Sequence, residues 1–92
     1  MQAQKRDSNE PEIIQALRRV NCVWIPMDRT AGFDAIVISP RTGTHIFEIK
    51  DPAKRWKLTP AEEKRKSEVE AVGGLYCIVL SAEQALIIAG YV

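Results

Sequence analysis

Two strand-like segments with apolar residues on both alternating faces constrain the fold more than any other part of this sequence. They read FDAIVIS, residues 33–39, and THIFEIK, residues 44–50, and the residues PRTG join them. Successive side chains of a strand point to opposite faces of its sheet, so a strand with one solvated face alternates apolar with polar residues. These segments do not alternate in that way. They predict a hairpin that is covered on both faces, within a sheet flanked by helices.

The remaining elements follow from capping residues, prolines and glycines, which mark where helices begin and end. The expected order is helix 9–21, strand 22–27, strand 33–39, strand 44–50, helix 61–74, strand 75–80 and helix 81–90. This α-β-β-β-α-β-α order predicts one α/β domain, residues 10–92, with a small mixed sheet between helices. Residues 1–9 are polar and are expected to form a flexible tail.

Gly43 sets the expected register of the hairpin. A three-residue loop with a type I turn at residues 41–42 needs a left-handed residue next, and glycine adopts that conformation most easily. That loop pairs Asp34 with Lys50 and leaves Glu48 diagonally across from Asp34. Two acids and a lysine would then share one face, at the end of the hairpin away from its turn.

The chemistry of this cluster has two interpretations. Two or three carboxylates suit Mg²⁺ or Mn²⁺, and a neighbouring lysine could orient a water, help deprotonate it or stabilise charge that develops on a phosphoryl group. Glu12, expected on the Ala16 edge of the buried stripe of the first helix, could complete the ligand set. Alternatively, Asp34 and Lys50 form a structural ion pair, which leaves Glu48 without a role.

Basic residues concentrate in one zone of the chain. From Lys50 to Lys66 there are seven basic and three acidic residues, a local charge of +4, whereas the rest of the chain carries −3. This zone is typical of a phosphate-binding face, although a solvated helix and loop would look the same. The candidate nucleic-acid-binding residues are Lys54, Arg55, Trp56, Lys57, Lys64, Arg65 and Lys66. Trp56 could stack on an unpaired base or pack beneath its loop.

The other reactive residue types indicate no further site. Cys22 and Cys77 lie in apolar strand-like runs, which fits reduced core thiols better than a disulfide or a metal site. His45 is expected on the face opposite the acids, and Trp24 in the core or at a dimer interface. The chain shows neither a secretory signal nor an apolar run of membrane-spanning length, so we expect a cytoplasmic protein.

Several motifs, taken together and in order, resemble a known group of enzymes. GFD at residues 32–34 and FEIK at residues 47–50, between helices, resemble the PD-(D/E)XK nuclease superfamily. The stretch EIKDPAKRWKLTPAEEKRKSEVEAVGGLYCIVLS resembles the VRR-NUC family of that superfamily, with its lysine-ending strand, proline loop, helix opening and double-glycine stop. The resemblance covers roughly residues 10 to 90. It implies a restriction-endonuclease-like fold.

The resemblance also implies roles for individual residues. Asp34 and Glu48 would be ligands of Mg²⁺ or Mn²⁺, Glu12 the helix-borne acid and Lys50 the catalytic lysine. Glu62 stands where the family usually has a glutamine facing the site. This extra carboxylate could change the metal preference or, by pairing with Lys50, depress activity. A further departure is Phe33, which stands where the family often has proline.

A minimal stand-alone chain resembles the family members of phage or prophage origin, which are similar to Holliday junction resolvases. The expected function is therefore metal-dependent, structure-selective cleavage of branched DNA by a homodimer, since a two-fold dimer presents two cutting sites to a pseudo-symmetric junction. Two alternatives stay open. One is a non-catalytic DNA-binding module with a nuclease fold, and the other is a plain structural or oligomerisation domain.

Overall fold

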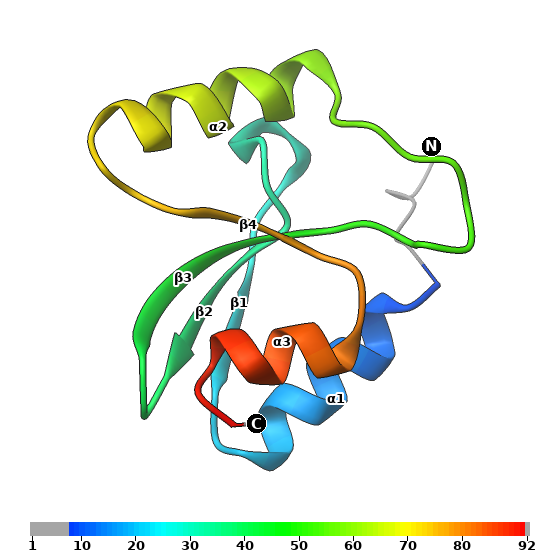
Figure 1. Ribbon diagram of the computed structural model, residues 1–92, viewed down its shortest axis with the longest axis vertical. Helices are drawn as coiled ribbons and strands as arrows, with labels where there is room; N and C mark the ends of the chain where they lie inside the picture. The colour runs from blue at the N-terminus through cyan, green and yellow to red at the C-terminus, as the bar shows by residue number, and fades with distance from the viewer. Residues whose placement is uncertain (1–7, 92) are drawn as a thin grey trace.

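The computed structural model describes residues 8–91 and follows the expected order of elements (Figure 1). They are α1 (Glu10–Arg19), β1 (Val23–Pro26), β2 (Ala35–Ser39), β3 (Gly43–Ile49), α2 (Pro60–Ala71), β4 (Tyr76–Val79) and α3 (Ala82–Ile88). A short 3-10 helix, η1 (Arg29–Ala31), lies between β1 and β2. The predicted α-β-β-β-α-β-α order is confirmed for the described residues.

The sequence predicts a flexible tail at residues 1–9. Residues 1–7 lie outside the described part of the chain. Ser8 and Asn9 make contacts with the domain. The Ser8 hydroxyl donates to the Asp51 carboxylate at 2.8 Å, and the Asn9 amide donates to the backbone oxygens of Lys50 and Leu80. These two residues therefore belong with the folded unit rather than with a tail.

The strands form one mixed sheet in the order β1-β2-β3-β4. The first two pairs are antiparallel, and β3 pairs with β4 in parallel. A parallel neighbour requires a long crossover, and α2 supplies it. The acidic end of β3 therefore lies beside the end of β4 and close to the start of α2.

One face of the sheet carries the hydrophobic core. The alternate residues Val37 and Phe47 are fully buried there against Ile13 and Leu17 of α1 and Ala85 of α3. In Figure 1, α1 and α3 lie together below the sheet and α2 lies above it. None of the described helices has the combination of length and apolar character needed to cross a membrane.

The opposite face is covered only in part, which corrects the expectation that both faces are buried. Val23, Ile25 and Ile38 share this face and remain 51%, 39% and 38% exposed. The α-helix on this side is α2, whose sequence PAEEKRKSEVEA has no apolar stripe and which buries none of its residues. A helix that is polar on most sides has no apolar surface with which to bury an apolar sheet face.

The hairpin register differs from the prediction by two residues, because the turn begins one residue earlier. Ser39 pairs with Gly43, and residues 40–42 form the turn. Ser39 Oγ accepts hydrogen bonds from the backbone N–H groups of Arg41 and Thr42 at 3.1 and 3.4 Å. Serine followed by proline is a favoured start of a type I turn, and this signal outweighs the placement based on Gly43 alone. Gly43 does adopt the predicted left-handed conformation, at φ 86°.

A shift of two residues leaves every side chain on its predicted face. It changes which charged groups meet. The paired residues end at Ala35 and Phe47, and the Asp34 N–H donates to the Phe47 oxygen, so Asp34 lies beside Glu48 instead of opposite Lys50. The predicted Asp34–Lys50 pair is therefore wrong, and Asp34 lies close to Glu48 at this end of the hairpin.

The remaining core predictions are confirmed. Cys22 is buried, Cys77 is half-buried, and both are free thiols. Trp24 packs against the core cluster. His45 is partly buried on the Phe47 face, with its ring 6.3 Å from the Phe47 ring, so it lies away from the acids.

Candidate active site

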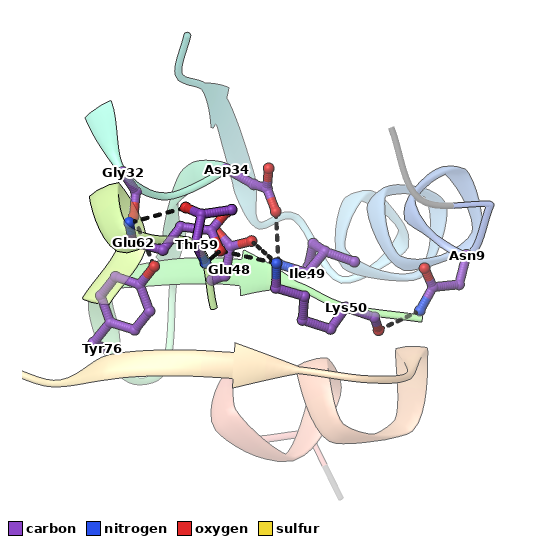
Figure 2. A network of polar contacts seen from close by, with 9 residues as sticks. All are labelled: Asn9, Gly32, Asp34, Glu48, Ile49, Lys50, Thr59, Glu62 and Tyr76. Carbon is purple, nitrogen blue, oxygen red and sulfur yellow. Dashed lines mark hydrogen bonds and ion pairs between the residues drawn. The ribbon is translucent and has the colours of Figure 1, made fainter. Parts of the chain in front are cut away.

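Asp34 reaches the site from the turn that follows η1. Its backbone N–H donates to the Phe47 oxygen at 2.9 Å. Its carboxylate oxygen Oδ2 accepts the backbone N–H of Ile49 at 2.7 Å. Asp34 is thus attached to β3 at two points, beside Glu48, and Figure 2 shows the acids and the lysine gathered at this end of β3.

Glu48 is the most deeply placed acid of the site, with only 2% of its surface exposed. Its Oε2 lies 3.4 Å from Lys50 Nζ, while its buried Oε1 has no hydrogen-bond partner among the described residues. Burial and then the charges of Asp34 and Glu62 raise the pKa of Glu48 to about 9, against a smaller opposing effect of Lys50. In the absence of metal, Glu48 therefore carries a proton at neutral pH.

Lys50 is held by Glu62, at 2.9 Å between Nζ and Oε1. Burial alone would lower the pKa of Lys50, but the hydrogen bond to Glu62 and the nearby acids outweigh burial and raise it. Burial acts to raise the pKa of Glu62, and its hydrogen bonds to Lys50 and to the Thr59 N–H outweigh burial and lower it. Lys50 is therefore an ammonium and Glu62 a carboxylate.

The start of α2 explains why Glu62 points toward Lys50. The hydroxyl of Thr59 accepts the Glu62 N–H at 3.2 Å, and Glu62 Oε1 accepts the Thr59 N–H at 2.9 Å. This reciprocal arrangement is a capping box, and Pro60 occupies the first helical turn as predicted. The same Oε1 atom therefore caps the helix and binds the lysine.

The expectation that Glu12 lies at the edge of the buried face of α1 is wrong. Glu12 is exposed, and the buried acid of α1 is Glu10, with 7% of its surface exposed. Glu10, Ile13 and Leu17 follow one another at spacings of three and four residues, which places them on one helix face. Glu12 falls about 100° away from Ile13. Extending the apolar spacing back by three residues would have identified Glu10.

Tyr76 belongs to the site and was not identified from the sequence. Its hydroxyl donates to the backbone oxygen of Gly32 at 2.6 Å, and the residue is 7% exposed. Burial, followed by the charges of Glu48, Glu62 and Asp34, raises the pKa of Tyr76. The phenol therefore remains a neutral donor beside the acids. No local pattern in LYCIVL separates this tyrosine from an ordinary core residue.

The predicted nucleic-acid-binding residues divide into an exposed set and an engaged set. Lys54, Arg55, Lys57 and Lys64 are exposed, and Trp56 is 40% exposed, so its ring is accessible. Arg65 and Lys66 have protein partners. Arg65 Nε donates to the Ala31 oxygen at 2.7 Å, and Lys66 Nζ lies 3.0 Å from Glu70 Oε2. The accessible cations therefore lie mostly on the loop before α2.

The acids fit a divalent cation that retains much of its water. Glu48 Oε1 is buried and has no hydrogen-bond partner within residues 8–91, and Asp34 lies close enough for its charge to act on the Glu48 carboxyl. A cation held by Asp34 and Glu48 would satisfy this oxygen and favour the ionised form of Glu48. No group of three or more His, Cys, Asp or Glu side chains within residues 8–91 forms a ready-made metal centre. Mg²⁺ commonly needs only one or two carboxylates besides water and a phosphate.

No protein-family model matches the chain, and no curated protein matches it in sequence. What the protein does must therefore be inferred from the residues and geometry of the site.

Proposed function

We propose that the protein is a divalent-metal-dependent endonuclease that hydrolyses phosphodiester bonds of DNA, with a site of the PD-(D/E)XK kind and a resemblance to the VRR-NUC family. One observation carries this proposal. Asp34 lies close enough to Glu48 for its charge to act on the Glu48 carboxyl, and the buried oxygen Oε1 of Glu48 lacks a partner within the described chain while the ammonium of Lys50 stands beside it. A plain structural ion pair would not need the second acid.

Asp34 and Glu48 would hold Mg²⁺ or Mn²⁺, and Glu10, rather than Glu12, is the better candidate for an additional acid from α1. A bound cation would polarise the phosphodiester and lower the pKa of a bound water. Lys50 is positioned to stabilise the negative charge that develops on the phosphate or to orient the attacking water. Asp34 and Lys50 are both anchored by hydrogen bonds, so these groups need little rearrangement.

DNA is the proposed substrate, and branched DNA such as a Holliday junction is favoured. The exposed cations of the loop before α2 would contact phosphates without reading base sequence. A chain of 10.3 kDa has a small footprint, and a homodimer would provide two matched cutting sites. The exposed apolar residues Val23, Ile25 and Ile38 support a second copy as the partner. The cytoplasm remains the expected location, since both cysteines are free thiols.

The alternative is a non-catalytic DNA-binding module with a nuclease fold. A specific contact favours it, because the Glu62 carboxylate already binds Lys50 at 2.9 Å. A lysine that is neutralised by a neighbouring acid stabilises a phosphate less. The two functions make the same prediction for DNA binding and opposite predictions for cleavage.

The test uses purified protein with labelled four-way junction, 5′ flap, single-stranded and duplex DNA in Mg²⁺ or Mn²⁺, and light scattering for the mass in solution. We expect metal-dependent cuts that disappear with EDTA and in Lys50→Ala, Asp34→Ala and Glu48→Ala. Glu63→Ala, which removes an exposed acid next to Glu62, is the matched control and should retain activity. Binding without cleavage in every metal would favour the module instead.

A further inference from the structure

The turn that carries Asp34 is held from two elements that are distant in the sequence. From β4, the Tyr76 hydroxyl donates to the oxygen of Gly32 at 2.6 Å. From α2, Arg65 Nε donates to the oxygen of Ala31 at 2.7 Å. Two consecutive backbone carbonyls just before Asp34 are thus bound by side chains from the second half of the chain.

Gly32 itself is packed against α2. It adopts a left-handed conformation at φ 78°, and a Cβ atom added there would lie 2.8 Å from Arg65 Cβ and 3.0 Å from the Ala61 oxygen. Any side chain would therefore push the turn away from α2 or strain its backbone. The close approach and the two hydrogen bonds act on the same short segment, residues 31–32.

The tyrosine reaches this turn across the site. Tyr76 pairs with Ile46 in the parallel register, and side chains of paired residues share a face, so its ring lies on the face of Glu48. Gly32 precedes β2, on the other side of β3 from β4. The phenol must therefore span β3 beside Glu48 to reach Gly32, and Figure 2 shows Tyr76, Gly32 and Glu48 in this arrangement.

We propose that Tyr76 and Arg65 are positioning residues of the proposed metal site, which hold the Gly32 turn and thereby set the placement of the Asp34 carboxylate beside Glu48. This inference rests on the proposed function, since it assigns the two acids to a metal. In this role both residues act on backbone oxygens of the turn. Arg65, expected from the sequence to contact DNA, instead acts through the backbone of the turn.

A purely structural role is the competing explanation, because a buried phenol needs a hydrogen-bond acceptor wherever it lies. The two explanations differ in what they predict for Asp34. If the role is purely structural, removing the side chain lowers stability and leaves the folded site unchanged. If the role is to position Asp34, removing the side chain loosens the contact of Asp34 Oδ2 with the Ile49 N–H and weakens metal binding in the folded protein.

The experiment measures Mn²⁺ binding by calorimetry on metal-free protein without DNA, for the variants Tyr76→Phe and Arg65→Gln. Tyr76→Phe removes one hydroxyl and keeps the ring. We expect both variants to remain folded and to bind Mn²⁺ about 10-fold or more weakly. Cleavage by Tyr76→Phe should recover at raised Mn²⁺, whereas a variant that is merely unstable would not recover. Because DNA is absent from the binding assay, a lost phosphate contact of Arg65 cannot contribute.

Matched controls make the same chemical deletions away from the site. Tyr91→Phe removes the hydroxyl of a tyrosine that lies against Arg41. Arg41→Gln removes a guanidinium that donates to a backbone oxygen, that of Gly90, at 3.0 Å. Both controls should bind Mn²⁺ as the wild type does.

A second readout separates failure of this inference from failure of the proposed function. Hydrogen exchange of the Ile49 amide reports the Asp34 contact directly and requires no metal. We expect faster exchange in Tyr76→Phe and Arg65→Gln than in the controls. Unchanged Ile49 exchange together with unchanged Mn²⁺ affinity would overturn the positioning role. Absence of Mn²⁺ binding in the wild type would instead overturn the proposed function, and the Ile49 exchange would still decide whether the turn depends on Tyr76.

Discussion

Glu48 is deeply buried and lies near an acid and a lysine. Its protonation makes the free energy of unfolding depend on pH. Its pKa rises from 4.5 to about 9 through burial and the charges of Asp34 and Glu62. Above pH 4.5 the unfolded chain releases this proton, whereas the folded chain keeps it until about pH 9. The folded state then binds more protons, so the free energy of unfolding falls as the pH rises through this window.

The substitution Glu48→Gln should therefore stabilise the metal-free protein, because an amide of the same shape is neutral without taking up a proton on folding. We expect a gain of about 1 to 3 kcal/mol at pH 8 that shrinks toward pH 4.5. Thermal or urea unfolding across this pH range measures it. Glu63→Gln, the same change at an exposed position of α2, should show no such trend. An equal effect of both substitutions would show that Glu48 does not hold the proton.

Glu62 is the second residue whose charge matters at this scale. Glu62→Gln keeps an oxygen for the Thr59 N–H and for Lys50 but removes the negative charge. If the full charge of Lys50 is then available to the phosphate, cleavage should rise several-fold at constant Mn²⁺. Single-turnover rates on the preferred DNA measure this, again with Glu63→Gln as the control. A fall in the rate would mean that the carboxylate is needed to position Lys50.

At the scale of the element, α2 is a capped helix whose start forms one wall of the site. It buries no side chain of its own, so its place depends on its capping box, on the close contact with Gly32 and on the Arg65 hydrogen bond. The N-terminal turn of this helix and the cluster of Glu48 and Lys50 therefore share the atom Glu62 Oε1. A substitution that alters the cap should therefore also alter the contact between Glu62 and Lys50.

Thr59→Ala tests this coupling. Loss of the cap should destabilise the protein by about 1 kcal/mol and should also reduce cleavage, because Glu62 loses the partner that orients it. Ser81→Ala removes the equivalent hydroxyl cap of α3, which accepts the Gln84 N–H at 3.1 Å. That control should lose similar stability and keep its cleavage rate. Chemical unfolding and initial rates measure the two effects separately, and equal losses of activity would refute the coupling.

At the scale of the whole molecule, the charge is distributed unevenly around a nearly neutral chain. The net charge is +1, yet the exposed cations Lys54, Arg55, Lys57 and Lys64 all lie on the loop before α2 or in its first turns. Binding to DNA through such a patch depends on the release of counterions and weakens with salt.

Lys57→Ala and Lys64→Ala should weaken binding to all DNA structures alike, and each should reduce the slope of log K against log salt by about 0.9. Lys66→Ala should change the slope less, because Lys66 is paired with Glu70. Arg19→Ala, an exposed cation at the end of α1 and outside this zone, is the control. Fluorescence anisotropy at several salt concentrations gives the slopes. If all four variants showed equal slopes of log K against log salt, the DNA would not bind at these exposed cations.

Local signals account for what could be predicted from the sequence alone. Prolines, caps and glycines determined the order of the elements, and the period of two residues along a strand determined which side chains share a face. These signals act over a few residues. Asp34, Glu48 and Lys50 could therefore be grouped at one end of the hairpin even though the register was wrong by two residues.

Only the tertiary structure decided what depends on contacts between distant segments. It attached Asp34 to β3 beside Glu48, bound Lys50 to Glu62, buried Glu10 instead of Glu12 and brought Tyr76 across β3 to Gly32. It also left part of one sheet face exposed, because α2 has no apolar stripe with which to cover it. The physical reason is common to all of these features. The partner of a polar side chain and the cover of a face are chosen by packing over the whole chain, whereas the local pattern specifies only the direction in which a side chain points.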